Sequence, residues 1–291
     1  MTKIACIGEA MIELAMTQSA GRDFAAVGVA GDTLNTAIYM HRSAPDIQVD
    51  YITRVGDDPF SDKIRSFIAA NGVGTQRIGR VRNASPGLYA ITTNEYGERA
   101  FTYWRNASPA RTLFAGGDFS ALDRYDALYI SGITMAILPH AVRLQLIQWL
   151  HDSNSVLIYD SNYRPNLWDS RNNAQMVTRA MWARADVALP SIDDEMLLFG
   201  EEAHETEARF AAFQGRGALK RGAEGPMSLG EPVTQTYPPA SDVIDTTAAG
   251  DSFNGAYVAA VLAGASQAEA LMRAHEMAAL VVQHSGAIVP L

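Results

Sequence analysis

A run of small and polar residues late in the sequence has the composition of an anion-binding turn. It reads Asp245-Thr246-Thr247-Ala248-Ala249-Gly250-Asp251-Ser252-Phe253-Asn254-Gly255, and apolar residues at helical spacing follow it. The first N–H groups of a helix lack intrahelical partners and lie at the positive end of its dipole, so they attract an anion without a cationic side chain. Because Ala248, Ala249 and Gly250 are small, a phosphate can approach these amides closely.

Asp251 follows these amides directly, and its carboxylate is the only strong proton acceptor of the run placed to face the same cavity. Phosphoryl transfer needs stabilisation of charge on the transferred group and a base that deprotonates the attacking hydroxyl. The sequence therefore predicts Asp251 as a general base beside an anion hole formed by Ala248, Ala249 and Gly250. On this fragment alone, a helix capped by Asp251 and packed through small residues is an equally good interpretation.

Other chemistries fit the sequence less well. The run 250–255 resembles a G-x-S-x-G nucleophile elbow, but its second glycine comes one residue late. The sequence contains no G-x-x-x-x-G-K-[ST], and no G-x-G-x-x-G follows the first predicted strand. The pairs His204-Glu205 and His275-Glu276 lack the second histidine of a zinc-protease helix, which indicates surface pairs.

Short apolar runs alternate with helical patterns along the chain, which predicts an α/β fold with a mainly parallel sheet covered on both faces. These runs are residues 4–7, 49–52, 127–131, 156–160, 187–190 and 218–220. Residues 11–28 and 86–103 break the rhythm and read as antiparallel hairpin strands, the second with a turn at 94–97. They could cover a ligand or form a decorative edge. One main domain with a small flap is the simplest interpretation.

Composition excludes several classes of function. The chain has 291 residues, 48% of them hydrophobic, and a net charge of −9, which disfavours a nucleic-acid or anionic-membrane partner. A single cysteine, Cys6, rules out an internal disulfide and is expected to be a small buried residue. No basic region with a long apolar segment opens the sequence and no run of about 18 apolar residues occurs, so a cytoplasmic protein is expected.

Two motifs, one near each end of the chain, make the sequence resemble the ribokinase-like (PfkB) carbohydrate kinases. That family has a carboxyl-terminal signature close to D-T-x-G-A-G-D, which residues 245–251 match apart from Ala248. Its amino-terminal signature corresponds to Ala30-Gly31-Asp32-Thr33-Leu34-Asn35-Thr36-Ala37. The resemblance implies a doubly wound α/β domain over residues 1–291, with a small β-sheet lid formed by segments of about 11–28 and 86–104.

Within the family, the details resemble the 2-keto-3-deoxygluconate kinase branch. The similar segments are residues 31–35, 103–106, 160–165 and 220–225, and Ala-Ala-Gly-Asp is a familiar form of the anion-hole motif in that branch. The resemblance implies that ATP and Mg²⁺ serve to phosphorylate 2-keto-3-deoxygluconate at its 6-hydroxyl, in an Entner–Doudoroff-type route. The alternatives are a kinase for fructose, ribose or a nucleoside, or a non-catalytic sugar-binding protein of the same fold.

The resemblance also implies roles for individual residues. Residues expected to bind the sugar, besides Asp251, are Gly31, Asp32, Thr33, Leu34, Asn35, Tyr89, Tyr103, Trp104, Arg105 and Arg164. Residues expected to bind ATP are Asn162, Tyr163, Arg164, Lys220, Arg221, Gly222, Ala223, Glu224, Gly225, Ala248, Ala249 and Gly250.

Arginine suits a sugar acid because its guanidinium grips a carboxylate through paired hydrogen bonds. Arg105 and Arg164 are the candidates, although taken without the motif each is more simply a surface ion pair. Tyr89 and Trp104 could likewise be ordinary packing aromatics.

Besides Ala248, the sequence departs from the family pattern at three places. Ala30 replaces a common glycine, and Ser161 stands where proline is frequent. The family's N-x-x-E element, which is associated with metal and phosphate, is not literal, since residues 190–195 offer Ser191 with Asp194, or Glu195 one place along. The metal ligands therefore stay open. Apolar lid strands often pair between subunits, so a homo-oligomer is expected.

Overall fold

The main sheet is parallel throughout except at one edge. The computed structural model describes residues 2–19, 22–93 and 99–290, so the turn predicted at 94–97 lies outside the described residues. The order of the eight strands is β12-β11-β10-β9-β8-β1-β4-β5, and only β12 runs antiparallel to its neighbour. Their bounds are β1 (Lys3–Ile7), β4 (Gln48–Val55), β5 (Ile78–Arg80), β8 (Ala127–Ser131), β9 (Val156–Asp160), β10 (Val187–Ala188), β11 (Arg216–Leu219) and β12 (Met227–Leu229).

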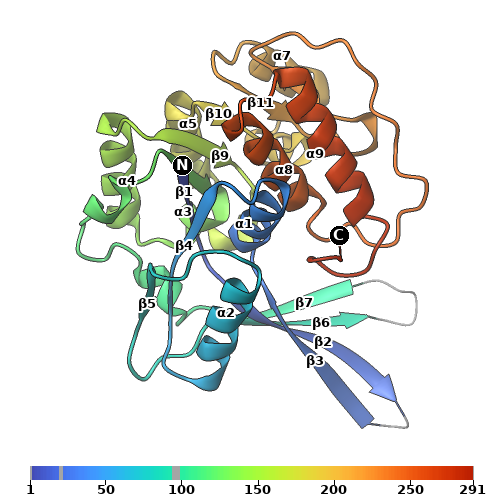
Figure 1. The fold of residues 1–291 in the computed structure, drawn as a ribbon. Helices are drawn as coiled ribbons and strands as arrows, with labels where there is room; N and C mark the ends of the chain where they lie inside the picture. The colour runs from blue at the N-terminus through green and yellow to red at the C-terminus, as the bar shows by residue number, and fades with distance from the viewer. Residues whose placement is uncertain (1, 20–21, 94–98, 291) are drawn as a thin grey trace.

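Helices cover both faces of this sheet, as expected of an α/β protein (Figure 1). One face carries α1 (Asp32–Ser43), α2 (Pro59–Ala70), α8 (Ala249–Leu262) and α9 (Gln267–Val281). The other carries α3 (Gly132–Ile137), α4 (His140–Asp152), α5 (Arg171–Arg184), α6 (Ile192–Phe199) and α7 (Ala203–Ala211). Short 3₁₀ turns lie at Pro109–Thr112, Ser120–Leu122, Pro165–Leu167 and Gly222–Glu224. The predicted doubly wound architecture is confirmed.

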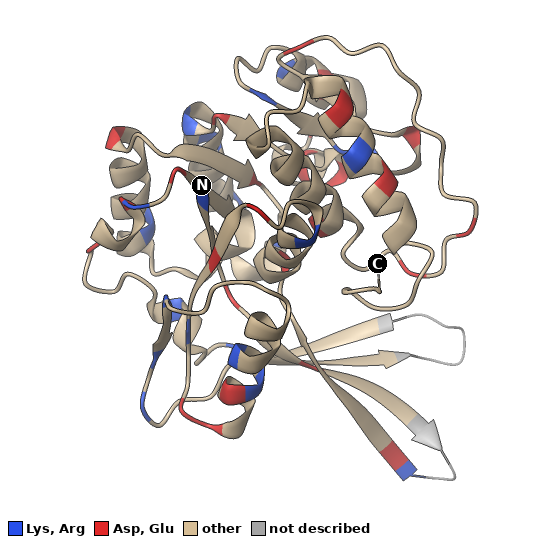
Figure 2. Cartoon of the chain, viewed as in Figure 1, with Lys and Arg blue, Asp and Glu red and all other residues tan. Residues whose placement is uncertain are grey.

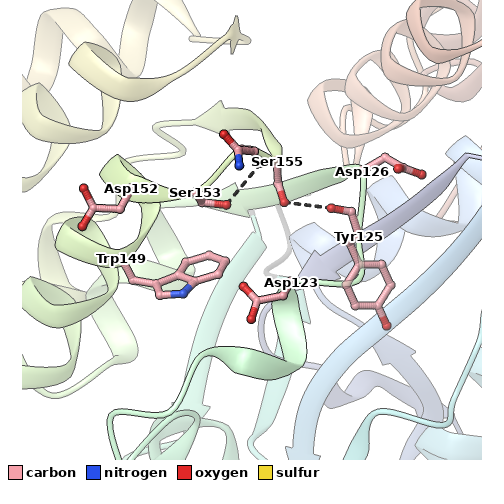
Figure 3. A pocket seen from close by; sticks show the side chains of 8 residues that line it. Asp123, Tyr125, Asp126, Trp149, Asp152, Ser153 and Ser155 are labelled. Atoms are coloured by element: carbon pink, nitrogen blue, oxygen red, sulfur yellow. Dashed lines mark hydrogen bonds between the residues drawn. The ribbon is translucent and has the colours of Figure 1, made fainter.

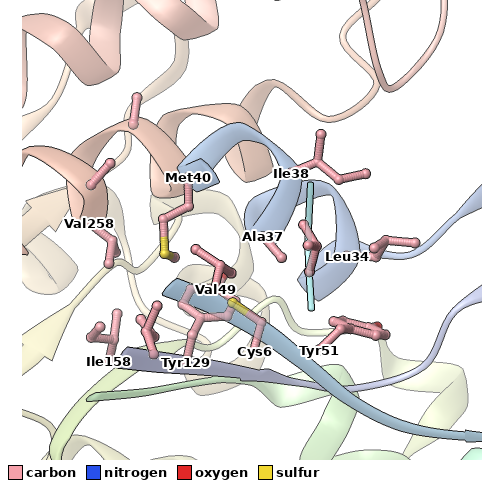
Figure 4. Close-up of a cluster of buried hydrophobic side chains, with 14 of the residues drawn as sticks. Cys6, Leu34, Ala37, Ile38, Met40, Val49, Tyr51, Tyr129, Ile158 and Val258 are labelled. Atoms are coloured by element: carbon pink, nitrogen blue, oxygen red, sulfur yellow. The ribbon is translucent and has the colours of Figure 1, made fainter. Parts of the chain in front are cut away.

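Alternation along β1 shows how one strand serves both cores. Ile4 and Cys6 point to the side of α1 and α8, whereas Ala5 and Ile7 point to the side of α3 and α4. Figure 4 shows Cys6 among the side chains packed between the sheet and α1. Its thiol is fully buried and burial raises its pKa, which makes it an inert packing residue.

A second sheet of four strands projects from the body (Figure 1). Its strands are β2 (Met11–Ser19), β3 (Arg22–Ala30), β6 (Leu88–Thr93) and β7 (Arg99–Trp104), in the order β3-β2-β6-β7. Each predicted hairpin is antiparallel, and the two hairpins join through a parallel pairing of β2 with β6. Lys, Arg, Asp and Glu are scattered over the helices of the body, while the four strands of this sheet carry few of them (Figure 2).

The connections bring distant motifs to one place. Loops that leave the carboxyl ends of parallel strands gather at the same sheet edge, where ligands bind in open α/β folds. Asp160 ends β9, Lys220 follows β11, and Glu9 lies two residues after β1. None of the helices within the described residues has the length and apolar character that crossing a membrane requires.

Candidate active site

A cavity of about 1070 Å³ lies at this carboxyl edge, between the body and the four-stranded sheet. Its lining draws on β6 and β7, on the starts of α1 and α8, and on the loops after β9 and β11. The following sequence-predicted site residues line it: Gly31, Asp32, Asn35, Tyr89, Tyr103, Arg105, Asn162, Arg164, Lys220, Arg221, Gly222, Ala223, Ala248, Ala249, Gly250 and Asp251. Residues up to 220 positions apart in the sequence thus share one cavity.

The other predicted residues lie outside the lining. Thr33 and Leu34 are fully buried, Thr33 with its hydroxyl 2.9 Å from that of Tyr51, because successive residues of a helix point in different directions. Tyr163 packs into the core on the α4 and α5 side. Trp104 is exposed, Glu224 lies in an exposed turn, and Gly225 is buried with a φ of 78°.

A smaller cavity of about 470 Å³ lies at the opposite edge of the sheet (Figure 3). Asp123, Tyr125 and Asp126 come just before β8, and Ser153 and Ser155 come just before β9. This cavity therefore opens at the amino ends of the strands and contains none of the predicted site residues.

Asp251 stands in the first turn of α8 and accepts a hydrogen bond of 2.9 Å from Nδ2 of Asn35 in α1. Burial, followed by the nearby charge of Asp32, raises the pKa of Asp251 to about 7. The bond from Asn35 opposes this rise because it favours the ionised form. A carboxyl group with this pKa can exchange a proton at neutral pH, as a general base requires.

Ala248, the residue that departs from the family's glycine, has an unusual backbone. Its φ of 61° and ψ of 15° are left-handed, and it forms the N-cap of α8. Asp245 fastens the approach to this turn, because its carboxylate accepts hydrogen bonds of 2.9 Å from the amides of Thr247 and Gly286. Within the described residues no side chain caps the start of α8. The amide of Ala249 donates to the carbonyl of Thr246 at 3.2 Å, whereas the amide of Gly250, which lines the cavity, has no such partner.

We expect Ala248→Gly to raise the free energy of unfolding by about 1 kcal/mol, because an L-residue pays for the left-handed conformation and glycine does not. The matched control is Ala208→Gly at an exposed position inside α7, which should lower stability by about 1 kcal/mol. Urea denaturation measures both. Destabilisation by the two changes alike would contradict strain at Ala248.

Lys220 is held beneath the start of α8 by a buried polar network. Its Nζ donates to Oδ2 of Asp160 at 2.8 Å and to Oδ1 of Asn254 at 3.1 Å, and Nδ2 of Asn254 donates to Asp160 at 2.6 Å. A Cβ built on Gly250 would lie 3.7 Å from this ammonium. One cation and the open amides of α8 therefore face the same part of the cavity.

Asn162 links the loop after β9 to α1. Its φ of 31° is left-handed, its amide donates to Asp160 at 3.1 Å, and its Nδ2 donates to Asp32 at 3.0 Å. Gly31 precedes α1, and a Cβ there would lie 2.3 Å from the carbonyl oxygen of Glu9. Only glycine allows this close approach of two loops at the cavity wall.

The four-stranded sheet contributes Tyr89, Tyr103 and Arg105. The Tyr89 hydroxyl donates to the carboxylate of Glu13, and its ring lies 5.5 Å from that of Tyr103. Arg105 is almost completely buried in an ion pair with Glu9.

The family model for pfkB family carbohydrate kinases matches residues 1–291. The chain belongs to this family. It is 39% identical to the 2-dehydro-3-deoxygluconokinase of Dickeya dadantii and 38% identical to that of Escherichia coli K12, over 99% of this chain and 97% of each relative. The crystal structure of a fructokinase with bound ATP from Xylella fastidiosa has the same fold, with a TM-score of 0.82 at 19% identity over 98% of this chain and 93% of that one.

In this pfkB-family chain, the structure separates the two candidates left open for the divergent N-x-x-E element. Ser191 and Asp194 line the cavity, and Asp194 forms an ion pair of 3.1 Å with Arg164. Glu195 is fully buried and pairs with Arg209 at 3.0 Å. Of these two carboxylates, Asp194 is therefore the one that lines the cavity.

Sequence reasoning gave no role to several residues that shape the site. Asp160 lies in the segment 160–165 and Asn254 in the run 245–255, so their place in these motifs could have predicted that they lie at the site. Glu9 and Glu13 carried none, because their partners Arg105 and Tyr89 lie 96 and 76 positions away.

Proposed function

We propose that this chain phosphorylates 2-keto-3-deoxy-D-gluconate with ATP, forming 2-keto-3-deoxy-6-phosphogluconate. The observation that carries the proposal is the meeting of Asp251, the open amides of α8 and Lys220 in one cavity that also holds Arg105. The proposal is supported by the similarity of this chain to two 2-dehydro-3-deoxygluconokinases, with 39 and 38% identity over nearly the whole chain. The proposed enzyme acts in the cytoplasm, where ATP is available. Its product would feed an Entner–Doudoroff-type route.

In the proposed reaction, Asp251 takes the proton of the 6-hydroxyl as that oxygen attacks the terminal phosphorus of ATP. The bond to the bridging oxygen then breaks and ADP leaves with its electron pair. The amide of Gly250 and the ammonium of Lys220 stabilise charge on the transferred group. Asn35 orients Asp251 through their hydrogen bond.

Charge in the cavity supports a divalent cation. Four cationic side chains and six acidic ones line it, so its lining is formally net acidic although both substrates are anionic. The described residues contain no cluster of three or more His, Cys, Asp and Glu arranged to hold a metal. Mg²⁺ does not need one, since it binds through phosphates, waters and one or two carboxylates. Asp194 would hold it, and Mg²⁺ would neutralise phosphate charge there.

A sugar panel tests the substrate. A coupled assay for ADP should show a higher kcat/KM for the keto-deoxy acid than for fructose, ribose or a nucleoside. Faster turnover of a neutral sugar would defeat the proposed substrate but keep a kinase. No ADP release with any sugar at high enzyme concentration would instead favour a non-catalytic sugar-binding protein.

The pH profile tests the base. Because Asp251 must be ionised to accept a proton and its pKa is about 7, kcat/KM should fall as pH decreases through about 7 and level off above it. Asp32→Asn removes a neighbouring negative charge, which lowers the pKa of Asp251 and should move the acid limb to lower pH. An acid limb that stays in place, or moves upward, would argue against this coupling.

We also propose that the four-stranded sheet is a lid that covers the sugar and pairs with a second copy. Phe24 and Trp104 on it are large, apolar and more than half exposed, which favours burial in an interface. Light scattering after size exclusion should give a dimer or larger assembly that Phe24→Asp shifts toward monomer. Met176→Asp, at an exposed position on α5, is the matched control and should leave the assembly intact. A monomeric wild-type chain would contradict the pairing.

A further inference from the structure

Arg105 is held by a carboxylate that no motif assigned. Glu9 lies just after β1 and Arg105 just after β7, and their exposed fractions are 2% and 7%. Oε2 of Glu9 accepts hydrogen bonds from Nε of Arg105, at 2.9 Å, and from Nη2. Within the described residues Nη1 of Arg105 has no hydrogen-bond partner, so both of its N–H groups are available to a ligand.

Stability does not explain this pair. Oε1 of Glu9 is buried and has no hydrogen-bond partner among the residues that the structure describes. A buried charged oxygen in that state is costly, and apolar residues in place of a buried ion pair are often as stable or more so. Because both residues line the cavity, the unfavourable arrangement points to a function there.

The backbone around the pair restricts its movement. A Cβ built on Gly87 would lie 2.5 Å from Oε1 of Glu9 and 3.1 Å from Cβ of Arg105. The same segment is fastened by the amide of Ile12, which donates to the carbonyl of Gly87 at 2.9 Å. The carboxylate and the guanidinium are therefore packed against the backbone just before β6, which this hydrogen bond holds in place.

We propose that Glu9 is a positioning residue that fixes the Arg105 guanidinium so that Nη1 binds the carboxylate of the sugar acid. An arginine side chain has many rotamers, and binding is stronger when one is already selected before the ligand arrives. The negative charge of Glu9 also neutralises the positive charge of Arg105. Recognition of the sugar carboxylate by Arg105 therefore depends on directed hydrogen bonds. The identity of the ligand group rests on the proposed function, whereas the action of Glu9 through Arg105 does not.

The test is a mutant cycle with Glu9→Gln, Arg105→Ala and the double variant. Glu9→Gln, whose amide oxygen can still accept a hydrogen bond from Arg105, should raise KM for the sugar acid about tenfold and leave KM for ATP within about twofold. In the Arg105→Ala background the same change should have almost no further effect on KM. Gly87→Ala displaces the carboxylate without removing it and should raise KM in the same direction.

The control is Glu201→Gln, which alters a more exposed Glu–Arg pair, with Arg209, outside the cavity and should leave both KM values unchanged. A lower KM in Glu9→Gln would show that Glu9 only shields charge and would overturn the inference. Independent effects of Glu9→Gln and Arg105→Ala would overturn it too. If the wild-type enzyme does not turn over the keto acid, the proposed substrate fails separately, and the cycle is run on the sugar that it does phosphorylate.

Discussion

Asp251→Asn is expected to lower kcat by roughly 10² to 10⁴, the usual scale for loss of a general base. Asparagine has nearly the same shape and its carbonyl can still accept the hydrogen bond from Asn35, but it cannot take a proton. The raised pKa of Asp251 shows that folding disfavours the ionised carboxylate at this position. A neutral amide should therefore leave stability unchanged or slightly higher.

Steady-state kinetics and thermal denaturation of the variant check this result. Asp62→Asn is the matched control, since Asp62 also lies in the first turn of a helix but pairs with Arg80 on the surface. It should keep normal kcat. A near-normal kcat in Asp251→Asn would remove Asp251 from the base role, and a collapsed melting temperature would mark it as structural.

Arg105→Ala is expected to raise KM for the sugar acid by about 10², and KM for ATP far less. Hydrogen bonds between charged groups contribute about 1.5–3 kcal/mol each, and about 1.4 kcal/mol corresponds to a factor of ten. The change also leaves Glu9 buried and unpaired, which should cost about 3–5 kcal/mol of stability. The companion variant Glu9→Gln with Arg105→Met removes both charges and should recover stability without recovering affinity.

Initial-rate measurements with each substrate varied in turn decide this prediction. Arg80→Ala, which breaks the surface pair with Asp62, should change neither KM. An equal rise in KM for sugar and ATP would disprove a specific carboxylate contact. A low sugar KM in the companion variant would show that Arg105 acts only through the stability of the pair.

Much of the site was readable because its signals are local. The open amides and Asp251 depend on where one helix begins, and small residues followed by an apolar stripe specify that start within about ten residues of sequence. The alternation of apolar runs with helical patterns likewise predicted a mainly parallel sheet covered on both faces, since each element follows from its own periodicity. Both hairpins of the second sheet were visible for the same reason.

The motifs predicted which segments of the chain form the site better than they predicted which side chains face the cavity. The contiguous run 31–35 was expected to contact sugar, yet Thr33 and Leu34 are buried because a helix directs only some successive residues to one side. Local pattern also could not choose between Asp194 and Glu195. Packing decided it, by burying Glu195 against Arg209.

The sequence by itself determined the class of fold, and it placed the proposed anion-binding turn and the proposed general base, because these depend on residues that are neighbours in the chain. Only the tertiary structure decided which distant groups act together. Asn35 meets Asp251 across 216 positions, and Glu9 meets Arg105 across 96. Such pairs depend on strand order and on how two sheets are joined, and these long-range choices leave no periodic trace in the sequence around either partner.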